Sequence, residues 1–65
     1  MKRYYFNLLD DDYNDLGAFI PDGSSKKTAL NRAKRWMAEN GLNKAQLEVN
    51  SMATDNILEM IDIEL

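Results

Sequence analysis

Basic side chains gather in one stretch of this 65-residue sequence, and their type and spacing suit a binding role. Five of the eight Lys and Arg residues fall within positions 26–35: Lys26, Lys27, Arg32, Lys34 and Arg35. Cations beside the free N–H groups of a helix's first turn can hold a phosphate or an acidic partner. The predicted contacts to an acidic protein or a nucleic acid are Lys26, Lys27, Arg32 and Arg35.

The two lysines lie where a helix dipole disfavours cations, by about 0.3 kcal/mol or more each. A sequence selected for stability alone would have Asp or Glu in this first turn instead. The alternative to a binding role is a solvated face whose cations pair with Asp and Glu residues of the same molecule. The net charge of −3 favours this alternative, as does the lack of aromatic residues among the cations for base stacking.

The side chains of common catalytic and metal chemistry are missing. The sequence has no His and no Cys, which removes zinc-type sites and the usual nucleophile–base pairs of acyl transfer. Ser24 and Ser25 have no identifiable base. We therefore expect a non-enzymatic protein and predict no catalytic residue, no cofactor and no metal.

An acidic turn resembles the start of a calcium loop, with Asp10, Asp12 and Asn14 at alternate positions. The sixth position of that loop would be Asp15 where Gly is needed, and the twelfth would be Pro21 where a bidentate Glu is needed. We therefore predict a solvated turn whose Asp and Asn side chains bind local backbone groups.

The cations belong to a helix predicted from about Lys26 to Asn40. Apolar residues recur at steps of three and four, which predicts one buried face: Ala29, Leu30, Ala33, Trp36 and Met37. Ser24 or Ser25 is the expected N-cap, and Gly41 can close the helix with a positive φ.

Alternating apolar residues predict strands over 3–9, 45–50 and 57–65, and a short extra strand over 17–20 that Pro21 ends. The expected fold is one α+β domain over residues 1–65, with order β-(β)-α-β-β. It is a small three- or four-stranded mixed or antiparallel sheet with one helix packed on one face. A right-handed crossover would make the first two long strands parallel, with the C-terminal strand between them.

A single helix covers one face of a sheet, so the other face should expose its apolar residues: Tyr5, Leu9, Met52, Leu58 and Met60. Exposed apolar patches usually mark an interface. We therefore predict a homodimer formed through this face or through an edge strand. The alternative is a bulge near Glu59 that turns Leu58 and Met60 inward.

The N-terminal residues show no apolar signal region, and no run approaches the ~18 apolar residues of a membrane span. We therefore expect a cytoplasmic protein with no membrane partner.

Two family resemblances add to this interpretation. The opening Met1-Lys2-Arg3-Tyr4-Tyr5-Phe6-Asn7, the Ala29/Ala33 helix and the closing strand pair resemble short uncharacterised bacterial proteins with an Arg-Tyr-Phe-Phe-type first strand. That resemblance implies the fold and no activity.

The second resemblance covers residues 4–38 and is to the N-terminal half of HicB-type antitoxins. It rests on Tyr4 to Phe6, Phe19-Ile20-Pro21-Asp22, Thr28-Ala29-Leu30 and Ala33. It implies a small RNA-cleaving toxin as the partner, and so an antitoxin-like adaptor as the alternative function.

Overall fold

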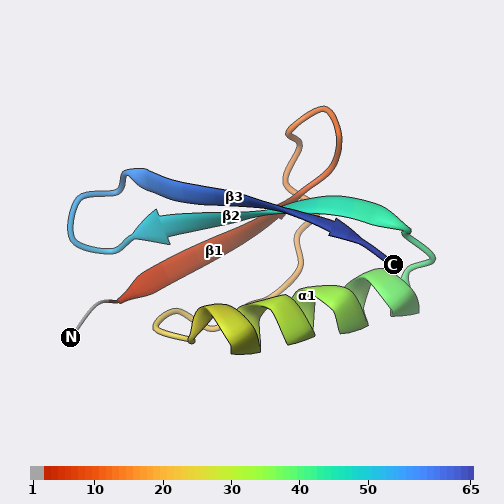
Figure 1. Ribbon diagram of the computed structural model, residues 1–65, viewed down its shortest axis with the longest axis horizontal. Helices are drawn as coiled ribbons and strands as arrows, with labels where there is room; N and C mark the ends of the chain where they lie inside the picture. Colours follow the sequence, from red (N-terminus) through yellow and green to blue (C-terminus); the bar gives the residue numbers. More distant parts are fainter. Residues whose placement is uncertain (1–2) are drawn as a thin grey trace.

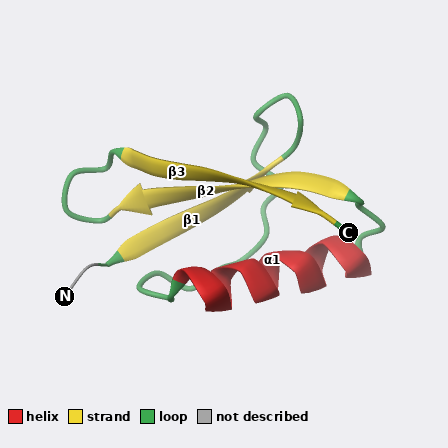
Figure 2. Ribbon diagram, viewed as in Figure 1, coloured by secondary structure: helices red, strands yellow, loops and turns green. Residues whose placement is uncertain are grey.

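The computed structural model describes residues 3–65 as a three-stranded antiparallel sheet with one helix across one face (Figures 1 and 2). The elements follow the order β1 (Tyr4–Leu9), α1 (Lys26–Glu39), β2 (Lys44–Ser51) and β3 (Ile57–Glu64). The predicted α+β fold class is confirmed. The sheet's other face is left without a helix.

The predicted strand order is wrong. The sheet has the order β1-β2-β3, and both neighbouring pairs are antiparallel. The reason is the loop after β1, which returns to the start of that strand before α1 begins, so that the Gly23 N–H bonds to the Tyr4 carbonyl at 2.8 Å. The helix therefore runs in the same direction as β1, and β2 must run back beside it (Figure 1).

Residues 17–20 do not form the predicted strand. The returning loop instead makes isolated contacts along β1, with a bridge between Leu9 and Asp15 and a bond from the Leu16 N–H to the Leu8 carbonyl. Ile20 is buried in the core, whereas Phe19 is 80% exposed.

The core lies between α1 and the strands. The helix contributes Ala29, Ala33 and Met37, which are fully buried, and small alanines let a helix approach a sheet closely. Trp36 is half-buried and packs against this core from the side. The strand residues of this core are Phe6, Leu8, Ala45, Leu47, Val49 and Ile63.

Both predicted helix ends are confirmed. The Ser25 hydroxyl caps the start by accepting from the Thr28 N–H at 3.1 Å, while the Ser24 hydroxyl donates to the Pro21 carbonyl. Gly41 has a φ of 70° after the last turn, and the Leu42 N–H bonds to the Met37 carbonyl.

A bulge interrupts β3, as the alternative interpretation expected. Val49 faces Glu59 but the next residue, Asn50, faces Ile57, so Leu58 is the extra residue. The bulge brings Leu58 to the helix side of the sheet, where it lines a hollow with Tyr4. Met60 is not turned inward, because it lies opposite Glu48 on the uncovered face.

Candidate functional site

One edge of the sheet, formed by β3, is open. The Leu65 N–H bonds to the Asn43 carbonyl at 2.8 Å, which fixes the backbone groups that β3 directs towards β2. Bonded pairs alternate along an antiparallel ladder, so the N–H and C=O groups of Met60, Asp62 and Glu64 point away from the sheet. We call these groups the open β3 edge, and such an edge is a template for pairing with another strand.

The opposite edge is partly covered by the protein's own chain. The outward carbonyls of β1 at Leu8 and Tyr4 accept bonds from the backbone N–H groups of Leu16 and Gly23. The segment 16–23 therefore lies along β1 and occupies two of the outward acceptors that a further strand would need. Among residues 3–65, the long unpaired edge is the one on β3.

Apolar side chains border the open β3 edge. Ile57 is 59% exposed, Leu58 is 53% exposed and Met60 is 38% exposed. Ile61 is half-buried at the margin of the core. Strands that are both exposed at the edge and apolar are favoured sites of association.

The centre of the uncovered face is polar. The Glu48 carboxylate accepts from the side-chain amides of Asn7 at 3.1 Å and Asn50 at 3.0 Å, and Asn50 is 2% exposed. Burial raises the pKa of the neighbouring Tyr5 hydroxyl, and the Asp55 carboxylate adds to that shift. The uncovered face is therefore not a continuous apolar surface.

The five residues of the predicted dimer face do not share one surface. Tyr5 and Met60 lie on the uncovered face, as expected. Leu9 is buried where the loop after β1 pairs with it. Met52 lies in the turn after β2, and Leu58 is on the helix side because of the bulge.

The four predicted cations of α1 also separate. The Lys26 ammonium lies 3.0 Å from a Glu59 carboxylate oxygen and 5.4 Å from the centre of the Tyr4 ring. The hydrogen bond to Glu59 raises the pKa of Lys26. Lys26 is thus held against the sheet, as the alternative of pairing within the molecule expected.

The remaining cations of α1 are exposed. Lys27, Arg32 and Arg35 are exposed. Within residues 3–65, the pair of Lys26 with Glu59 is the single ion pair whose nitrogen and oxygen atoms lie within 4.0 Å of each other. Lys34 was not predicted as a contact, but it is exposed two turns after Lys27 and so lies on the same side of the helix. We call Lys27, Arg32, Lys34 and Arg35 the basic helix face.

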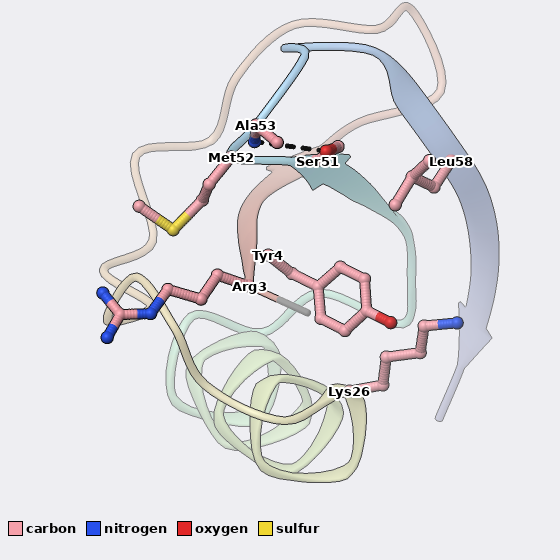
Figure 3. A pocket seen from close by; sticks show the side chains of 7 residues that line it. All are labelled: Arg3, Tyr4, Lys26, Ser51, Met52, Ala53 and Leu58. Atoms are coloured by element: carbon pink, nitrogen blue, oxygen red, sulfur yellow. Dashed lines mark hydrogen bonds between the residues drawn. The ribbon is translucent and has the colours of Figure 1, made fainter. Parts of the chain in front are cut away.

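A hollow of about 690 Å³ opens between the start of α1 and the turn after β2. Figure 3 shows the Tyr4 ring between Leu58 of β3 and Met52, which belongs to the turn after β2. Arg3 and Lys26 lie on opposite sides of this ring. Because Leu58 belongs to β3, the hollow extends the apolar surface of that strand to the helix side.

The acidic turn satisfies its own backbone, as predicted. One Asp10 carboxylate oxygen accepts from the Asp12 N–H at 2.8 Å and the Asn14 N–H at 2.9 Å. The bond from Asn14 is the main cause that lowers the pKa of Asp10. The residues 3–65 contain no group of three or more His, Cys, Asp or Glu side chains that could hold a metal ion.

Comparisons of the chain with protein-family models, curated proteins and solved structures find no match. Both family resemblances therefore stay predictions. No helix within residues 3–65 is long and apolar enough to cross a membrane.

Proposed function

We propose that this protein is a non-enzymatic interaction module that self-associates through the open β3 edge and the apolar side chains beside it. The observation that carries the proposal is the contrast between the two edges. The outward carbonyls of Tyr4 and Leu8 on β1 already have partners within the chain. The outward groups of Met60 and Asp62 on β3 have none within residues 3–65.

Association through the centre of the uncovered face is less favourable. It would bury the Glu48 carboxylate, whose partners are the neutral amides of Asn7 and Asn50. Removing a carboxylate from water without a cationic partner costs several kcal/mol, on the order of the whole stability of a small domain. Pairing at the edge leaves this carboxylate in solvent.

The experiment is sedimentation over a wide range of protein concentrations, with Met60→Pro as the test variant. Proline removes the outward N–H, and an edge strand tolerates it where that N–H faces solvent. Met60→Thr is the matched control because it removes the same side chain but keeps the donor. We expect Met60→Pro to weaken association at least tenfold more than Met60→Thr, with unchanged circular dichroism. A chain that stays monomeric at high micromolar concentration contradicts the proposal.

A second function, binding of an acidic partner, is favoured by the basic helix face. All four of its cations are exposed, and this is the surface that an antitoxin-like or nucleic-acid adaptor would use. Charge reversal of Lys27 and Arg35 should abolish salt-dependent binding to a single-stranded oligonucleotide. Lys44→Glu is the control, because it reverses a cation that lies off the helix. Binding that survives the helix variant excludes this function.

A cytoplasmic location is also part of the proposal. It is supported by the absence of Cys from the sequence, which suits a reducing compartment.

A further inference from the structure

We infer that the open β3 edge pairs with the same edge of a second copy, antiparallel and with Ile61 on the two-fold axis. This inference rests on the proposed self-association and adds its geometry. A second copy of the chain can pair with this edge because its outward N–H and C=O groups lie at the same alternate positions along β3. The register then depends on which side chains the pairing sets opposite one another.

Electrostatics excludes the registers centred nearer the C-terminus. An axis at Asp62 sets Asp62 directly opposite its own copy, and an axis at Glu64 does the same for Glu64. An axis at Ile63 sets Asp62 opposite Glu64 of the second copy. Like charges directly opposite each other destabilise a strand pair, so these three registers are disfavoured.

The bulge separates the two registers that remain. An axis at Met60 would pair Leu58 with Asp62 of the second copy and would draw the bulged residue into the new ladder. Bulges disrupt pairing locally. An axis at Ile61 keeps the central pairs within residues 59–63, where the ladder between β2 and β3 is regular.

The Ile61 register also fits the side chains on the helix side of the sheet. Ile61 is half-buried at the margin of the core, and its copy would lie directly opposite, so the two cores would join there. Glu59 would lie opposite Ile63 of the second copy. The ion pair with Lys26 already neutralises Glu59. This pairing limits the repulsion between Glu59 and the acidic side chains of the second copy.

This geometry determines where the two helices lie. Antiparallel strands pair about an axis perpendicular to the sheet, so both copies of α1 would lie on the same side. The two β2 strands would be three strand spacings apart, about 14 Å. A helix with its side chains is about 10 Å wide. The two basic helix faces would therefore stand side by side on one surface of a six-stranded sheet.

Single cysteine variants test the register, because the natural chain has no Cys. Ile61 would form a non-hydrogen-bonded pair with its copy, in which the Cα atoms are about 4.5 Å apart. That spacing is within the range that a disulfide can bridge. Under mild oxidation we expect Ile61→Cys to cross-link about tenfold faster than Met60→Cys or Asp62→Cys. Fastest cross-linking of Met60→Cys or Asp62→Cys would overturn the register.

Amide hydrogen exchange gives a second measurement on the unmodified chain. The outward N–H groups of Met60 and Asp62 should become protected as the protein concentration rises, whereas the exposed amides of the loop at Asp11 should not. A dimer without this protection overturns the inferred pairing but leaves self-association intact. A chain that sediments as a monomer throughout contradicts the proposed function itself, so the two failures can be distinguished.

Discussion

The Lys26 ammonium lies 3.0 Å from the Glu59 carboxylate, so the first turn of α1 is tied to the strand that forms the open edge. The same ammonium lies over the Tyr4 ring of β1. Lys26 therefore spans the sheet from one outer strand to the other. Its neighbour Lys27 is exposed about 100° further round the helix, so two adjacent lysines have different surroundings.

Removing this ion pair should lower stability slightly, because both side chains are nearly half exposed and solvent screens the pair. We expect Lys26→Met to reduce the urea midpoint. Lys27→Met, the matched control, should leave the midpoint unchanged or raise it, since it removes an unpaired cation from the helix start. The raised pKa of Lys26 means that its contribution is complete below the ordinary value of 10.5 and is lost as the pH rises through the folded value. Equal effects of the two variants would contradict this role.

The turn at Asp10 should stabilise the fold in a pH-dependent way. Its pKa is lowered in the folded state, chiefly by the bond from Asn14. The contribution is therefore present above the ordinary value of 3.8 and is lost as the pH falls through the lower folded value. Thermal unfolding of Asp10→Ala should show a lower melting temperature at pH 7 and little difference near pH 2. Asp11→Ala, the control in the same turn, should change neither, and an equal loss there would count against the mechanism.

The buried amide of Asn50 should be important for stability. It donates to Glu48 and, at 3.4 Å, to the Tyr5 carbonyl. Asn50→Ala leaves these acceptors without that donor, which costs about 1–3 kcal/mol. Chemical denaturation measures the loss. Asn31→Ala, at an exposed helix position, should be neutral or slightly stabilising, and a similar loss at both sites would refute the prediction.

Neutralising Asp62 should strengthen association. With Ile61 on the axis, the two Asp62 side chains become diagonal neighbours on the uncovered face, about 7 Å apart. We expect Asp62→Asn to tighten the dimer several-fold in sedimentation at low salt and less at high salt, where the charges are screened. Asp11→Asn makes the same change in net charge in the loop and serves as the control. Weaker association of Asp62→Asn would argue against this register.

The local structure was predictable from the sequence because it depends on neighbouring residues. The spacing of Ala29, Ala33 and Met37 defines the buried face of α1, and Ser25 and Gly41 define its ends. The same alternation of apolar residues located all three strands. These features fix the fold class.

The strand order depends on contacts between residues far apart in the sequence. No local sequence pattern indicates that the loop after β1 runs back along that strand and brings Gly23 beside Tyr4. The break in alternation near Glu59 did reveal a bulge, but its direction depends on the pairing of Asn50 with Ile57. The sequence likewise identified Lys26 as unusual without identifying its partner 33 positions later. Lys34 could have been found from its spacing of seven residues from Lys27.

The covering of β1 by segment 16–23 has a consequence for the size of any assembly. Growth of a fibril by strand addition needs a receptive strand at each side of every subunit, so that each new member offers a further site. Here the carbonyls of Tyr4 and Leu8 are already occupied. The proposed association through β3 would therefore use the available strand of both members, and growth would end at two subunits. In such a dimer the loop after β1 would protect a sheet with an apolar edge against polymerisation.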